Sequence, residues 1–349
     1  MTTTAPAAAA PGRVRPLRRA PALAAGLVVG LVLLAVLAVV SVGVGARQVA
    51  PLDAWHALTA FDPTSFDHAA VRSRVPRTAV ALVVGAALGL AGTLMQGLTR
   101  NPLGDPGILG INAGASAAVV LGIFVARVSD PRGYVWFAFV GAAAAAVVVH
   151  LVASAGREGA TPVKLALAGA CVAAALTSLV TAVLVTRTDA LDTFRFWQVG
   201  SVGGRDLSQV AELAPFLVVG AVLALASGRM LDAAALGEDV ARGLGQHVGR
   251  ARAIVGVAVV LLCGAATALA GPIAFVGLVV PHVGRAITGP DHRWLLPYSA
   301  LLGAALLVVS DVLGRVVAAP GQLEVGLVTA VVGAPVFVAL VRRRRLAEL

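Results

Sequence analysis

Charged residues are scarce in this chain, and lysine is almost absent. Only 13% of the 349 residues are charged, whereas a soluble domain carries roughly 25%. Hydrophobic residues make up 59%, so the chain cannot cover a globule of its size with polar side chains. We therefore expect the folded protein to face a lipid bilayer.

The chain also lacks the short motifs of several enzyme classes. Its sole lysine, Lys164, follows Val163 rather than glycine, so no GxxxxGK[ST] loop is present to cradle a phosphate. No HExxH motif occurs, and none of the six histidines stands at metal-ligand spacing. We expect no catalytic residue, metal or cofactor on this chain, and interpret the histidines as structural or solvated.

Cysteine and buried acid are equally rare. Cys171 and Cys263 lie in apolar runs without a CxxC or His neighbour, and are interpreted as small buried hydrophobic residues. Asp311 is the clearest acidic residue inside an apolar run, and Arg315 follows it on the same helix face. This spacing predicts a structural ion pair rather than the mid-membrane relay of a secondary transporter.

The positive charge follows the pattern of membrane loops. The formal net charge is +10, but the arginines fall singly or in small groups between apolar runs. A nucleic-acid binder would gather them on one soluble face, so we expect no nucleic-acid partner.

Long apolar runs predict an all-α polytopic membrane protein with about ten transmembrane helices. Each span needs about 20 apolar residues, and the first run is too long for the core of a signal peptide, ~7–15 residues. The short break at Gly271-Pro272 leaves nine or eleven spans open. The predicted spans are 21–45, 77–98, 108–126, 134–154, 163–186, 209–228, 251–270, 272–288, 294–316 and 324–341.

Ten spans place both ends of the chain on one side. Arginines stand before the first span and in the run 342–345 after the last, and basic loops favour the cytoplasm. We expect a disordered cytoplasmic tail at 1–20, a membrane domain at 21–341 and a basic cytoplasmic tail at 342–349.

Two segments of similar sequence suggest an internal repeat. GAALGLAGTLMQ begins at Gly85 and GAATALAGPIAF begins at Gly264. The first runs inward and the second outward on this map, so an inverted repeat is predicted.

Residues 96–115 interrupt the apolar pattern with QGLTRNPLGDPGILGINAGA. Pro102 and Pro106 stop a helix, and irregular backbone at membrane depth is tolerated where it lines a cavity or is buried in protein. Asn101 and Asn112 can bond a polar passenger or unpaired carbonyl groups. A capped turn and the lining of a transport path are equally good interpretations of these residues alone.

Nine motifs stand in order along the chain: RVPR (74–77), GLTRNPLGDPGILGINAGA (97–115), LALAGA (165–170), FRFWQVGSV (194–202), LGEDVARGLG (236–245), GPIAFVGLVVPHVGR (271–285), GPDHRWLLP (289–297), DVLGR (311–315) and EVGLVTAVVGAPVF (324–337). Together they resemble the permease subunits of bacterial ABC importers for ferric siderophores, haem and cobalamin. FRFWQVGS and GPDHRWLLP are most similar to the ferric-enterobactin branch.

The resemblance implies a type II ABC importer permease fold with no enzymatic activity of its own. Two copies, or this chain and a paralogue, would enclose a path in the inner membrane. A separate ATPase pair would bind ATP and Mg, and a substrate-binding protein would deliver a ferric siderophore from outside. Cobalamin or haem is the alternative cargo. An ion-coupled secondary carrier and an integral membrane enzyme are the alternatives from other classes.

The resemblance also assigns docking and gating roles. Arg74, Arg77 and Arg315 match arginines that pair with glutamates of the binding protein. The alternatives are headgroup anchoring for the first two and pairing with Asp311 for the third. The implied pathway and gate residues are Gln96, Asn101, Pro102, Leu103, Asn112, Thr161, Pro162 and Val163. Relatives often carry small hydroxyl residues where this chain has Pro162 and Val163.

The loop 229–252 is implied to form the coupling helices that enter a groove of the ATPase. Leu236, Val240 and Leu244 recur every four residues and give a short amphipathic stripe. A helix on the membrane surface is the alternative, but the glycine breaks and acidic residues disfavour it. The implied coupling residues are Leu236, Gly237, Glu238, Val240, Arg242, Leu244 and Gly245.

Residues 194–204 are implied to form a short external helix over the mouth of the path. Phe196 and Trp197 are equally well interpreted as interfacial aromatic residues.

Overall fold

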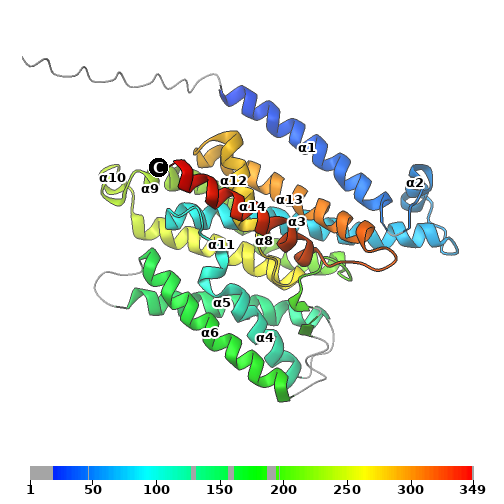
Figure 1. The fold of residues 1–349 in the computed structure, drawn as a ribbon, viewed down its shortest axis with the longest axis horizontal. Coiled ribbons are helices and arrows are strands. Elements are labelled where there is room, and N and C mark those ends of the chain that lie inside the picture. Colours follow the sequence, from blue (N-terminus) through cyan, green and yellow to red (C-terminus); the bar gives the residue numbers. More distant parts are fainter. Residues whose placement is uncertain are drawn as a thin grey trace, which may run out of the picture.

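The computed structural model describes residues 19–45, 47–126, 131–155, 161–186, 194–195 and 197–347. All regular elements among them are helical (Figure 1), which confirms the all-α prediction. The helices are α1 (Arg19–Gly43), α2 (Pro51–Thr59), α3 (Phe66–Thr99), η1 (Pro106–Leu109), α4 (Ile111–Val125), α5 (Pro131–Ser154), α6 (Pro162–Thr186), α8 (Leu207–Ala226), α9 (Gly228–Ala235), α10 (Glu238–Gly243), α11 (Val248–Ala270), α12 (Val276–Thr288), α13 (His292–Val317) and α14 (Val325–Ala347).

Each predicted span coincides with one of these helices. Among the described residues, seven helices are long and apolar enough to cross a membrane, namely α1, α3, α5, α6, α8, α11 and α13. The other three predicted spans correspond to the shorter apolar helices α4, α12 and α14. Gly271 ends α11 with a φ of +75°, and α12 begins at Val276, so two separate helices flank the doubtful boundary.

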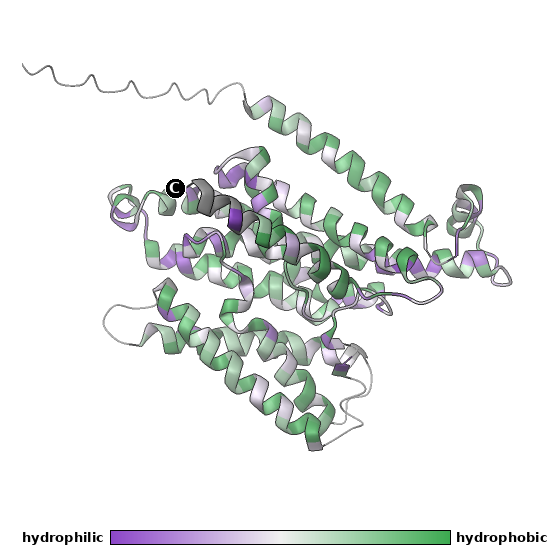
Figure 2. Cartoon of the chain, in the orientation of Figure 1, coloured by the Kyte–Doolittle hydropathy of each residue, from purple (hydrophilic) through white to green (hydrophobic). Residues whose placement is uncertain are grey.

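The long helices lie lengthwise beside one another (Figure 1). Helices α9 and α10 lie at the same end of the bundle as the C-terminus, and α2 lies at the opposite end. Figure 2 shows hydrophobic residues along the helices and hydrophilic residues mainly at their ends. This distribution is what a bilayer around the middle of the bundle requires.

Helix α3 forms the centre of the bundle. Its most apolar window is 78% buried, whereas that of α1 is 0% buried and that of α6 only 17%. The outer surfaces of α1 and α6 are therefore left for lipid or for another chain.

Small residues allow the neighbours of α3 to approach closely. A Cβ added at Gly85 would lie 2.3 Å from the carbonyl oxygen of Gly303 in α13, and one at Gly92 would lie 2.2 Å from that of Gly277 in α12. Close backbone contact of this kind is the usual way for helices to pack in membranes. The core thus depends on glycine as much as on large apolar side chains.

One expectation, the burial of both cysteines, needs correction. Cys171 is exposed on α6, so the prediction that it is buried was wrong; Cys263 is buried as predicted, and both are free thiols. Helix α14 continues to Ala347, so most of the predicted basic segment 342–349 is helical, and its cytoplasmic location stays a prediction. Residues 1–18 of the predicted N-terminal tail lie outside the described part of the chain. The repeated segments lie on α3 and at the end of α11, and the inverted repeat stays a prediction.

Candidate functional site

The interruption after α3 is a tight turn built by its own polar side chains. Arg100 ends α3 with a φ of +49°. The Asn101 Oδ1 atom accepts a hydrogen bond of 2.9 Å from the backbone N–H of Leu103. Asp105 similarly accepts from the N–H of Gly107 at 2.7 Å, while burial raises the pKa of this carboxyl group. Side chains of Asn and Asp commonly close turns in this way.

Gln96 and Asn112 join helices beside this turn. Gln96 is 2% exposed; its Nε2 donates to the Gly277 carbonyl at 3.0 Å, and its Oε1 accepts from Arg285 at 2.6 Å. The Asn112 Oδ1 atom accepts from the Thr267 hydroxyl at 3.1 Å. Both predicted pathway residues therefore hold neighbouring helices together, and their contact with cargo stays a prediction.

The second predicted gate segment begins α6 at the same end of the bundle as the turn (Figure 1). The Thr161 hydroxyl accepts from the N–H of Lys164 at 3.3 Å and so caps the helix. Val163 is 77% exposed, and the side chain of Pro162 lies outside the described part. A Cβ at Gly169 would overlap the carbonyl oxygen of Ile108 in η1, so α6 packs directly on the segment that follows the turn.

The predicted coupling loop presents an apolar surface at this end. Leu236, Val240 and Leu244 are 65%, 50% and 66% exposed, so the four-residue stripe faces outward. Gly237 and Gly245 flank α10 with φ values of +108° and +80°, which favour glycine over other residues. These two glycines allow the chain to turn sharply before and after α10.

A hydrogen-bonded pair of side chains fixes the helix that precedes α10. The His292 Nδ1 atom lies 2.7 Å from the Asp232 Oδ1 atom, which also accepts the backbone N–H of His292 at 3.0 Å. Burial opposes ionisation of Asp232, but these hydrogen bonds hold the pKa of its carboxyl group below the ordinary value. The pair attaches α9 to the start of α13.

The predicted docking arginines lie at the opposite end, and they are buried. Arg74, Arg77 and Arg315 are 7%, 9% and 3% exposed. The Arg77 Nε atom lies 2.6 Å from one oxygen of Asp311, and the Arg315 Nη2 atom lies 3.0 Å from the other. The predicted pairing of Asp311 with Arg315 is therefore confirmed, and it is part of a larger buried network.

Two of these arginines also cap the end of α1. Arg74 donates to the carbonyl oxygens of Val42 and Gly43 at 3.2 and 2.8 Å, and Arg315 donates to that of Ser41 at 2.9 Å. The last carbonyl groups of a helix lack partners within it, and cations are favourable there. These arginine side chains already bond groups of their own chain, so docking a binding protein would require them to exchange partners. The docking role stays a prediction.

Sequence spacing could not reveal these contacts. Arg77 and Asp311 are 234 positions apart, and Gln322, which also accepts from Arg77, lies in a loop with no recognisable motif. The ion pairs of Glu238 likewise join different elements, because Arg100 ends α3 and Arg252 lies in α11. The sequence offers one signal: with a cytoplasmic N-terminus, the predicted spans place Arg74 and Arg77 at the outer side of the membrane, whereas basic residues favour the cytoplasmic side.

The aromatic residues after α6 belong to the core. Phe194 and Trp197 are 1% and 4% exposed, with ring centroids 5.9 Å apart. Trp197 is therefore a packed core residue rather than an interfacial one, and Phe196 lies outside the described part. No group of three metal-ligating side chains occurs within the described ranges.

Comparison with known proteins shows which family shares these helices and motifs. A model of the FecCD transport family matches residues 33–343. The ferric enterobactin transport system permease protein FepD of Escherichia coli K12 is 45% identical over 320 residues, covering 90% of this chain and 94% of that protein. The iron(3+)-hydroxamate import system permease protein FhuB of Bacillus subtilis 168 is 40% identical, covering 91% and 83%.

A solved structure is similar over nearly the whole fold. It is an inward-facing conformation of a metal-chelate type ABC transporter, with a TM-score of 0.79 and 26% sequence identity. The match covers 92% of this chain and 99% of the solved one.

Proposed function

The chain belongs to the FecCD transport family, and we propose on this basis that it is the membrane permease subunit of an ATP-driven importer of ferric siderophores. The observation that carries the proposal is the nearly full-length similarity to FepD, an enterobactin permease. The family consists of transport permeases rather than enzymes, which agrees with the lack of catalytic motifs. Transport energy must then come from nucleotide hydrolysis on a separate subunit.

The two ends of the bundle suggest its orientation and partners. The end that carries α9 and α10 has exposed apolar residues on a short helix, which suits a groove of a cytoplasmic ATPase. The opposite end would face the exterior and a substrate-binding protein. The exposed length of α6 suits a second permease copy or a paralogue, with the path between them. Both termini would then be cytoplasmic.

The experiment that tests the proposal is uptake by the assembled transporter. The chain, its ATPase and its binding protein are reconstituted in proteoliposomes with ATP inside, and labelled ferric enterobactin, ferric hydroxamate, haem and cobalamin are offered outside. We expect ATP-dependent accumulation of a ferric siderophore. Accumulation of cobalamin or haem alone would contradict the proposed cargo, and absence of any ATP dependence would contradict the importer.

The exposed stripe of α10 gives a prediction about ATPase assembly. Leu244→Asp places a charge where an apolar contact is proposed, so ATPase recovered with the permease should fall by about tenfold, as for a strong interface residue. Quantitative pull-down from detergent measures the ratio. Leu52→Asp is the matched control, because Leu52 is 65% exposed at the other end of the bundle. Equal recovery with both variants would contradict the coupling role.

Arg74 separates docking from an internal role. Arg74→Gln leaves carbonyl groups at the end of α1 without a charged donor, and the cost is about 1–3 kcal/mol of stability. We expect a lower melting temperature from this contact alone, and weaker affinity for the binding protein if docking uses the same side chain. A lower melting temperature with unchanged affinity would remove Arg74 from the docking site.

A further inference from the structure

Helix α10 has little apolar packing to hold it against the rest of the protein. Ala241 is its one buried side chain, while Val240 within it and Leu244 just after it are at least half exposed. The stabilisation from apolar packing scales with the area removed from water, so this small contact holds α10 weakly. Besides the chain itself and its packing on α9, a side-chain contact joins α10 to two transmembrane helices.

Glu238, the first residue of α10, makes that contact. Its carboxylate pairs with Arg252 in the first turns of α11 and lies 3.6 Å from Arg100 at the end of α3. It also pairs with Arg242 within α10 at 3.0 Å. The Glu238 side chain is 28% exposed, and charges that are partly shielded from solvent are screened less than exposed ones.

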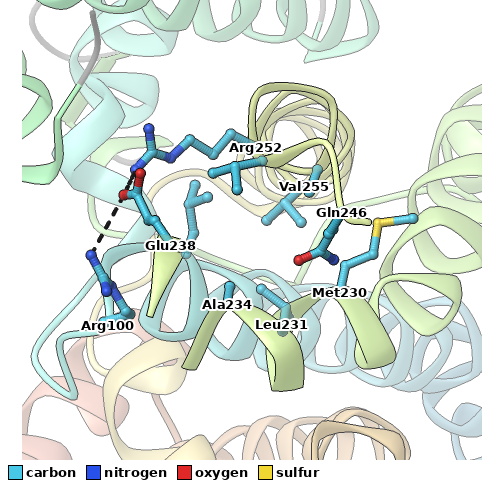
Figure 3. Close-up of a pocket in the computed structure, with 11 residues that line it drawn as sticks. Arg100, Met230, Leu231, Ala234, Glu238, Gln246, Arg252 and Val255 are labelled. Carbon is cyan, nitrogen blue, oxygen red and sulfur yellow. Dashed lines mark hydrogen bonds and ion pairs between the residues drawn. The ribbon is translucent and has the colours of Figure 1, made fainter. Parts of the chain in front are cut away.

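Glu238, Arg100 and Arg252 lie on one side of a pocket between α9, α10 and α11 (Figure 3). Met230 and Gln246 lie on the other side, and Leu231 and Ala234 lie between. The ion pairs of Glu238 therefore link α10 to both long helices at the edge of this pocket.

Arg100 connects this link to the inner turn. It is the residue immediately before Asn101-Pro102-Leu103, and its φ of +49° lies in a region that few non-glycine residues occupy. Its guanidinium group therefore extends from the backbone of the turn itself. A displacement of Glu238 acts on that backbone through one side chain.

We propose that Glu238 is a positioning residue that transmits movement of α10 to the inner turn through Arg100 and to α11 through Arg252. The inference rests on the proposed function, in which an ATPase moves α10. The resemblance implied that Glu238 contacts the ATPase, but the structure pairs its carboxylate with arginines of its own chain. Replacing Glu238 by glutamine therefore leaves the exposed Leu236, Val240 and Leu244 in place for the ATPase. The ATPase can then still turn over, but its movement is no longer passed to the turn.

The test measures uptake and ATP hydrolysis in the same proteoliposomes containing the complete complex. For Glu238→Gln we expect the amount of cargo moved per ATP to fall by about tenfold, within the usual range of coupling between sites, while hydrolysis stays within about twofold of the parent complex. A purely structural role would lower both rates together with the amount of assembled complex. A parallel loss of uptake and hydrolysis would therefore overturn the proposal.

Asp239→Asn is the matched control. Asp239 is the next residue of the same helix; its side chain is 98% exposed and pairs with Arg242 in its own helix. The same loss of charge there should leave the ratio of uptake to hydrolysis unchanged. Equal ratios for the two variants would also overturn the proposal.

Arg252→Gln breaks the ion pair of Glu238 that leads to α11 and leaves the one with Arg100 in place; it serves if the Glu238 variant does not assemble. If both residues act through one contact, the double variant should lose no more coupling than the stronger single variant. Additive losses would contradict a shared contact. A parent complex that shows no ATP-driven uptake would refute the proposed function, whereas normal uptake with an unaffected Glu238 variant refutes this inference alone.

Discussion

Replacement of Asp311 by alanine is expected to remove most of the folded chain from the membrane. Asp311 is 0% exposed and lies between the guanidinium groups of Arg77 and Arg315. Removing one partner of a buried ionic group leaves uncompensated charge and costs about 3–5 kcal/mol. Fluorescence-detected gel filtration and thermal unfolding of the purified chain measure the effect.

Two further variants make this prediction specific. Asp53→Ala removes an exposed carboxylate at the same end of the bundle and should have little effect. The double variant Asp311→Leu with Arg77→Met should be less damaging than Asp311→Ala, because one of the unpaired charges is removed with its partner. Wild-type stability of Asp311→Ala would show that the buried network does not support the fold.

Replacement of Gly92 by valine is expected to force two packed helices of the core apart. A Cβ at this position would lie 2.2 Å from the carbonyl oxygen and 2.3 Å from the Cα atom of Gly277. Both are backbone atoms and cannot turn away as a side chain would, so α3 and α12 must separate. Overpacking costs about 1–3 kcal/mol in soluble cores and occasionally more, and we expect a value at or above the upper end.

Gly256→Val is the control for this substitution. Gly256 lies inside α11, and a Cβ added there would meet no atom within 4 Å. Both variants introduce the same β-branched residue into a helix, so the difference in melting temperature isolates the helix contact. Equal melting temperatures would contradict the close packing of α3 on α12.

Sequence reasoning found the helices because hydrophobicity along the chain is a local property. A span needs an uninterrupted apolar run. The short break at Gly271-Pro272 left the number of spans open, and the structure shows two separate helices, α11 and α12, on its two sides. The same reasoning placed Asp311 and Arg315 on one face, since their spacing is that of a helix turn. The four-residue spacing of Leu236, Val240 and Leu244 also predicted that they share one face, and the structure leaves all three exposed.

The contacts within the site could not be found in this way. The partner of Arg77 is on another helix, and the acceptors of Arg74 are backbone carbonyl groups, which have no signature in a sequence. Arg74 and Arg77 stand at the predicted outer side, against the usual charge bias, but only the folded structure shows that they are buried. Similarly, the exposed position of Cys171 depends on which face of α6 meets the bundle, and a uniformly apolar helix does not reveal that face.

The central claim is that the energy for transport comes from nucleotide hydrolysis on a separate subunit. Purified chain is placed in liposomes and labelled ferric siderophore is offered at equal concentration on both sides, with and without the ATPase, the binding protein and internal ATP. The account predicts accumulation inside only when all three are present. Accumulation against a gradient by the chain alone, driven by an ion gradient without any ATPase, would contradict it.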